Sequence, residues 1–133
     1  MRIILVLLFI SFFSVPNILG QDKVWFDVNG NTTTKEKAVY YSVFSNDKKK
    51  NKIIKDYYLS GKKAKEFYVV NGKKEGKFVA FYATGEVKII GEFENGLKEG
   101  MWKTYYSNGK MKEKGKYSSG EKTGVWKLFY KNN

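Results

Sequence analysis

The chain of 133 residues carries 25 lysines and arginines against 13 aspartates and glutamates, a formal net charge of +12. It has no histidine and no cysteine, which removes the commonest general bases, nucleophiles and transition-metal ligands and leaves no disulfide. Its single arginine is Arg2, so the side chain best suited to bidentate contacts with nucleic acid is absent from the rest of the chain. We therefore expect no catalytic residue, no cofactor, no metal site and no nucleic-acid ligand.

The first 20 residues predict a signal peptide. Arg2 gives a positive start, an apolar run follows over residues 3–15, and the small residue Gly20 precedes a polar stretch. We expect a helix that is cleaved near Gly20–Gln21 and exports the rest of the chain to the periplasm, the outer membrane or the medium. Ile18 fits the cleavage rule poorly, so retention as a membrane anchor is the alternative. A cleaved chain would contact a membrane only peripherally.

Residues 21–48 predict a leader, or cap, that contains strands. Residues 24–28 and 38–44 have the composition of strands, and Thr33 and Glu36 have the spacing of a capping box at one short helical turn. An array of hairpins has two open edges that invite aggregation. We expect the leader to cover one of these edges.

The remainder of the chain, residues 49–133, repeats one pattern with a period of 24 residues. The rows are 49–72, which is degenerate, then 73–96, 97–120 and a truncated row at 121–133. The positions that define the repeat are Gly76, Phe78, Tyr82, Gly85, Gly91, Gly96, Gly100, Trp102, Tyr106, Gly109, Gly115, Gly120, Gly124, Trp126 and Tyr130. Because the spacing of 24 residues is constant from row to row, the repeat is a structural unit.

Each row predicts a β-hairpin, because dipeptides such as Asn95–Gly96 and Ser119–Gly120 favour the positive φ angles of tight turns. Gly91 and Gly115 fall inside strands, where glycine normally weakens a sheet. We expect the missing side chain to leave room for a neighbouring Trp or Tyr ring to lie across the backbone. The predicted fold is all-β: an elongated single-layer antiparallel meander of hairpins after the signal-peptide helix.

Strict alternation along the strands assigns the side chains to two faces. A stripe is expected on one face, made of Phe78, Trp102 and Trp126 with Tyr82, Tyr106 and Tyr130, while Phe81, Tyr105 and Phe129 lie on the other. In the strand that follows Gly109, the expected dry face holds Met111, Gly115 and Tyr117, and the wet face holds Lys112, Lys114 and Lys116. The stripe predicts cross-strand stabilisation, with binding of sugar rings or an extended partner segment as the alternative.

The column pattern Gly-x-Trp-x-x-x-Tyr-x-x-Gly, followed by an internal glycine, an aromatic residue and a closing glycine, resembles the MORN repeat. The resemblance is to the variant form of secreted bacterial proteins and of the YwqK antitoxin group. It covers residues 73–133 and weakens over 49–72, where Lys52 and Phe67 replace the expected glycines. It implies a meander of hairpins that serves for interaction or scaffolding, and it implies no reaction.

Lysines concentrate over residues 48–77, which hold eleven of them against Asp56, Glu66 and Glu75. The eleven are Lys48, Lys49, Lys50, Lys52, Lys55, Lys62, Lys63, Lys65, Lys73, Lys74 and Lys77. They predict a patch for anionic lipid or glycan. The alternative is a solubilising surface that protects exposed strand edges.

Glu75 and Glu99 are the carboxylates that the repeat brings nearest to a catalytic pair, about 10 Å apart if each row adds two strand spacings. In an open loop no burial would raise the pKa of one of the two carboxyl groups, so neither is suited to act as a general acid. We therefore favour solvated surface charges. An enzyme is therefore not expected.

These features together predict an exported, non-enzymatic interaction or scaffold protein of the bacterial envelope, with a protein as its partner. The alternatives are an electrostatic binder of anionic lipid or glycan and an antitoxin-like neutralising protein. Because the third row ends after its first strand, residues 125–130 also predict an edge-strand dimer or the addition of a partner's strand.

Overall fold

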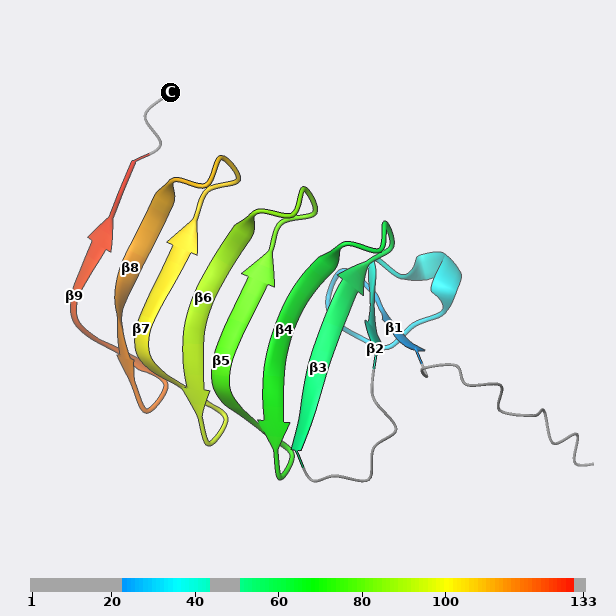
Figure 1. Ribbon diagram of the computed structural model, residues 1–133, viewed down its shortest axis with the longest axis horizontal. Coiled ribbons are helices and arrows are strands. Elements are labelled where there is room, and N and C mark those ends of the chain that lie inside the picture. Colours follow the sequence, from blue (N-terminus) through cyan, green and yellow to red (C-terminus); the bar gives the residue numbers. More distant parts are fainter. Residues whose placement is uncertain (1–22, 44–50, 131–133) are drawn as a thin grey trace, which may run out of the picture.

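The computed structural model describes residues 23–43 and 51–130, which form one nine-stranded antiparallel sheet. Figure 1 shows the strands side by side in chain order, so the predicted all-β, single-layer meander is confirmed. The elements are β1 (Lys23–Phe26), the 3-10 helix η1 (Lys35–Lys37), β2 (Tyr40–Val43), β3 (Asn51–Tyr58), β4 (Lys63–Val70), β5 (Lys73–Phe81), β6 (Val87–Glu94), β7 (Leu97–Tyr105), β8 (Met111–Ser118) and β9 (Glu121–Leu128). The predicted signal-peptide helix at 1–20 lies outside the described residues. Within those residues, no helix has the length and apolar character needed to cross a membrane.

Two-residue turns join the strands at the end of each row. Asn95 and Gly96 have φ angles of +50° and +85°, and Ser119 and Gly120 have +48° and +87°. A turn with positive φ at both central residues matches the right-handed twist of the strands that it joins. The predicted tight hairpin turns are therefore confirmed at these positions.

The connections in the middle of each row are longer and are tied to the next row by tyrosine hydroxyls. In the loop between β5 and β6, the Tyr82 N–H donates to the Glu86 carbonyl over 2.8 Å, and the Gly85 N–H donates to the Tyr82 carbonyl over 2.9 Å. The hydroxyls donate to backbone carbonyls one row further on: Tyr58 to Phe81 at 2.8 Å, Tyr82 to Tyr105 at 2.7 Å and Tyr106 to Phe129 at 2.8 Å. These three tyrosines thus fix successive rows to one another at the loops.

The core lies on one face of the sheet, which we call the ring face. It consists of buried Phe78, Ala80 and Trp102, against which Phe67, Ile89, Phe93, Tyr117 and Trp126 pack. The Phe78 and Trp102 rings stack with centroids 5.6 Å apart, and Tyr117 contacts both tryptophans edge-on, at 5.8 Å from Trp102 and 5.1 Å from Trp126. The aromatic stripe is confirmed for Phe78, Trp102 and Trp126, with Tyr117 inserted between the two tryptophans.

The glycines inside β6 and β8 lie beneath tryptophan rings. A Cβ placed on Gly91 would stand 2.7 Å from Cε3 of Trp102, and one on Gly115 would stand 2.6 Å from Cγ of Trp126. Both distances are too short for carbon atoms that are not bonded, so the prediction that these glycines make room for rings is confirmed. In the preceding row, Phe67 takes the position of these glycines. The Phe78 ring lies beside the Phe67 ring, with the two centroids 6.2 Å apart.

A bulge near the start of β8 changes the face of one residue. The register pairs Thr104 with Glu113 and Tyr105 with Met111, so Lys112 is skipped. Met111 therefore shares the face of Tyr105. The expectation that Met111 lies with Gly115 and Tyr117 is wrong, because one extra residue in a strand inverts the alternation on one side of it.

The leader continues the sheet instead of forming a separate layer. β2 pairs with β3 and β1 pairs with β2, so the leader covers the β3 edge, as predicted. At this junction the buried Ser42 hydroxyl donates to the buried Asp56 carboxylate, which also forms an ion pair with Lys65 at 3.0 Å. The short helical turn is present as η1, but its N-cap is Thr34 and makes no side-chain capping bond, so the predicted capping box is wrong.

Candidate functional site

The second face of the sheet, which we call the open face, carries a row of cross-strand neighbours. Side chains that pair directly across strands lie on the same face, about 5 Å apart. From β4 to β9 this row consists of Glu66, Val79, Ile90, Lys103, Lys114 and Lys127. Its first part is mainly apolar and its last three positions are all lysine.

An apolar hollow of about 450 Å³ lies over β4 to β6 on the open face. Its lining comprises Tyr68, Val79, Phe81, Val87 and Ile90, with Lys63, Glu66 and Lys77 at the same surface. Phe81 pairs with Val87, which places both residues on this face and agrees with the predicted position of Phe81. Tyr68 is 45% exposed, so water reaches part of this apolar surface.

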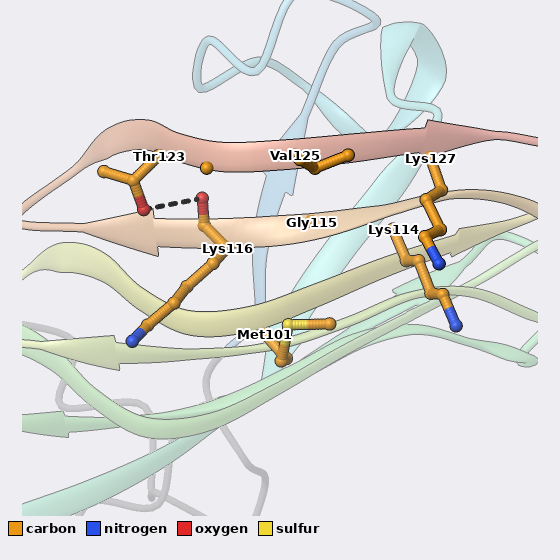
Figure 2. Close-up of a pocket in the computed structure, with 8 residues that line it drawn as sticks. Met101, Lys114, Gly115, Lys116, Thr123, Val125 and Lys127 are labelled. Atoms are coloured by element: carbon orange, nitrogen blue, oxygen red, sulfur yellow. Dashed lines mark hydrogen bonds between the residues drawn. The ribbon is translucent and has the colours of Figure 1, made fainter.

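A second hollow, of about 390 Å³, lies over β7 to β9, and we call it the basic hollow. It is lined by Met101, Lys114, Gly115, Lys116, Thr123, Gly124, Val125 and Lys127. In Figure 2 the side chains of Lys114 and Lys127 lie next to each other and point the same way, while Lys116 extends in another direction. The Thr123 hydroxyl donates to the Lys116 carbonyl over 3.4 Å. No carboxylate lines this hollow.

The repeat allows the basic hollow to be compared with the equivalent place one row earlier. Lys114 stands where the earlier row has Ile90, and Lys116 stands where it has Glu92. Thr123 stands where the earlier row has Glu99. Relative to that earlier place, the basic hollow lacks two carboxylates and has two additional lysines, while its Met101 stands where the earlier place has Lys77. The backbone register at the bulge is the same in both places.

The basic hollow was not predicted from the sequence, because the lysines that it brings together are not close along the chain. Lys103, Lys114 and Lys127 come from three strands and are dispersed in the sequence. A signal was present, because the register of a 24-residue hairpin repeat brings those columns together. It could be used only once the bulges that set the register were known.

The lysines of the predicted patch are distributed over both faces. Lys65 pairs with Asp56 on the ring face, and Lys63 forms an ion pair of 2.6 Å with Glu66 beside the apolar hollow. The Lys62 ammonium donates to the Thr84 carbonyl at 3.0 Å. Lys52 and Lys73 are exposed, and Lys55 pairs with Glu66 across strands. Lys77 lines the apolar hollow on the open face, whereas Lys74 lies over the ring face. The remaining members lie outside the described residues: Lys48, Lys49 and Lys50.

Three lysines in one column of the repeat cover the aromatic rings of the ring face. The Lys74 ammonium lies 4.8 Å from the Phe67 ring centroid, that of Lys98 lies 4.5 Å from Trp102, and that of Lys122 lies 3.9 Å from Trp126. Attraction between a cation and a ring face favours these positions. Burial lowers the pKa of Lys74, with neighbouring Lys65 as a further cause. Lys74 therefore belongs to the packing of the ring face.

Glu75 and Glu99 stabilise hairpin turns. The Glu75 carboxylate accepts a hydrogen bond from the Asn95 N–H, and that of Glu99 accepts one from the Ser119 N–H, both over 2.8 Å. Glu75 in β5 thus stabilises the turn between β6 and β7, and Glu99 in β7 stabilises the turn between β8 and β9. Among the described residues, no group of three or more Asp and Glu side chains is arranged to hold a metal ion.

Comparison with protein families matches the regular rows. Residues 74–95 and 98–119 each match the family described as MORN repeat variant. Such repeats commonly bind proteins or lipids and are generally non-catalytic. Comparisons with curated proteins and with solved structures find no match. The matched residues lie in the hairpins β5–β6 and β7–β8, while β3–β4 and β9 continue the same sheet outside the matched residues.

Proposed function

We propose that this protein is an exported, non-enzymatic interaction module of the bacterial envelope that binds another protein through the open face of its sheet. The observation that carries the proposal is the set of large apolar side chains that this face exposes to water. Met101 is 51% exposed and Val125 is 81% exposed. Both side chains line the same hollow, and exposed apolar side chains that gather at one place mark sites of interaction.

The construction of the sheet supports a role in binding. A sheet normally buries at least one face against a second layer, and here the ring face is covered by its own lysine side chains. The open face carries two hollows instead of such a cover. The match to MORN repeats agrees with this proposal, since these repeats commonly bind proteins or lipids.

The test is in-cell crosslinking with a photoreactive amino acid at position 101 or 125. The control carries it at Val28, which is exposed in the leader between β1 and η1. We expect one envelope protein to be crosslinked from the open face and not from position 28. Equal products at both positions, or a cytoplasmic product only, would contradict the proposal. The N-terminal residue of the purified protein tests cleavage near Gly20–Gln21.

A second candidate function is the binding of anionic lipid or glycan, and one observation favours it. Lys55, Lys63 and Lys77 gather around Glu66 and lower the pKa of its carboxyl group, with the Lys63 hydrogen bond as the main cause. Three lysines around one carboxylate leave an excess of positive charge at the rim of the apolar hollow. Binding to phosphatidylglycerol vesicles that is lost as salt rises, and is reduced by K55Q/K77Q, would support this function.

A further inference from the structure

We propose that the basic hollow binds an extended acidic segment of the partner protein, with apolar side chains next to its carboxylates. This inference rests on the proposed function and names the chemistry of the partner. The hollow is formed by Met101, Lys114, Lys116, Val125 and Lys127 above the glycine backbone of β8 and β9.

Three lysines of the open face place positive charge side by side, and the Lys114 ammonium lies 5.9 Å from the Phe129 ring centroid, a weak attraction that does not neutralise it. Lys114 pairs directly with Lys103 on one side and with Lys127 on the other. Like charges directly opposite each other destabilise a sheet. In the described part of the chain, none of these three lysines has an ion-pair partner; the pairs found there are Lys63–Glu66, Lys65–Asp56 and Lys122–Glu113. A bound carboxylate would relieve the repulsion that the folded chain leaves in place.

The equivalent place one row earlier carries different side chains on the same backbone. Where the basic hollow has Lys114 and Lys116, that row has Ile90 and Glu92 on the same backbone. The repeat therefore folds without lysine at these positions. The excess of positive charge belongs to this one place in the chain, because the earlier place balances Lys77 and Lys103 with Glu92 and Glu99.

The shape of the basic hollow favours a peptide over a membrane. Of the three lining lysines, Lys114 is only partly exposed and lies at the wall of a hollow whose rim includes the more exposed Val125, whereas Lys116 and Lys127 are exposed. A flat layer of headgroups best reaches charges that protrude, whereas an extended chain can enter a hollow. Met101 and Val125 add apolar walls, which suit aliphatic side chains better than the hydroxyl groups of a glycan.

The probe is a fluorescein-labelled synthetic peptide in which pairs of glutamates alternate with pairs of valines. A peptide with glutamine in place of glutamate is its matched control. We expect fluorescence anisotropy to show binding of the acidic peptide that weakens as salt rises, and little binding of the glutamine peptide. Equal binding of the two peptides, or binding of neither, would overturn the proposal.

The test variant is K114I/K116E, which installs the residues of the preceding row. We expect the acidic peptide to bind about tenfold more weakly, a change of about 1.4 kcal/mol. The control K35Q/K37E also replaces one lysine by a neutral residue and one by glutamate, at exposed positions in η1. It should bind as the wild type does. An equal loss in both variants would show attraction by net charge alone and would refute the site.

A urea midpoint equal to that of the wild type establishes that K114I/K116E is folded. If K114I/K116E is not folded, the variant K114Q/K127Q takes its place.

Phosphatidylglycerol vesicles and polygalacturonate serve as the membrane and glycan arms of the experiment. Binding to either of them in place of the acidic peptide would overturn the proposal. If position 101 crosslinks the same envelope protein in wild type and in K114I/K116E, the proposed function stands and this inference fails. If the peptide requires Lys114 but no envelope protein is crosslinked, the site stands and the proposed function fails.

Discussion

The indole of Trp102 lies across the backbone of Gly91, in the space that a side chain at position 91 would occupy. A Cβ there would stand 2.7 Å from Cε3 of the ring, and the indole N–H donates to the carbonyls of Glu92 and Glu99, both over 3.2 Å. The ring is 4% exposed, which makes it the most buried of the core rings. Gly91 therefore stabilises the sheet because, without a side chain, it leaves room for the Trp102 ring.

Replacing Gly91 by alanine should lower the free energy of unfolding by about 2–3 kcal/mol, because the added methyl group displaces the Trp102 ring. Gly91→Val should lower it further. The control is Glu92→Ala at the next, exposed position, which should change stability by about 0.5 kcal/mol or less. Urea unfolding followed by tryptophan fluorescence measures both. A Gly91→Ala protein as stable as the wild type would show that the ring does not need this space.

Replacing Tyr82 by phenylalanine should destabilise the sheet by about 1 kcal/mol, because the partly buried Tyr105 carbonyl loses its donor. Tyr106→Phe should cost less, since its bond to the Phe129 carbonyl is exposed. Tyr68→Phe serves as the control, because the Tyr68 hydroxyl makes no hydrogen bond with the described residues and its side chain is 45% exposed. Urea midpoints that fall equally in all three variants would refute a specific role for these bonds.

Replacing Glu99 by alanine should loosen the turn at Ser119–Gly120, because the carboxylate accepts the Ser119 N–H. We expect a loss of about 1 kcal/mol and faster hydrogen exchange of the Ser119 amide. The Asn95 amide, which the Glu75 carboxylate binds in the same way, should keep its rate and is the internal control. Acceleration of both amides by the same factor would indicate general unfolding and not loss of one turn contact.

The stability of the β3–β4 hairpin should depend on acid through Glu66. Its pKa is lowered below the ordinary value of 4.5, chiefly by the hydrogen bond from Lys63. A carboxyl group whose pKa is lowered by folding contributes stability that is fully present above its unfolded pKa and is lost as the pH falls through its folded pKa.

We therefore expect Glu66→Gln to be less stable than the wild type at pH 7 by no more than about 1 kcal/mol, because the ion pair is partly exposed. The difference should shrink as the pH falls below 4.5, the ordinary value of this group. Urea midpoints of the two proteins across that range measure it. A difference that stays constant from pH 7 to acid would show that the charge of Glu66 is not involved.

Much of the fold could be predicted from spacing alone, because a turn residue, a ring and a missing Cβ act locally. The dipeptide Asn95–Gly96 determines a tight turn by its φ preferences, and Gly91 predicts a ring across the strand by its place inside one. The period of 24 residues then requires that every row repeat the same hairpin. The expected roles of Gly91 and Gly115 were therefore confirmed.

The sequence by itself determined that this chain forms hairpins laid side by side and that it lacks histidine and cysteine. Only the tertiary structure decided which side chains share a face. The bulge at Lys112 moved Met111 to the open face, and the register across β7, β8 and β9 gathered Lys103, Lys114 and Lys127 from distant positions. The reason is physical: side chains alternate with a period of two, so a single extra residue inverts a face, and hydrogen bonding between strands sets where that residue falls.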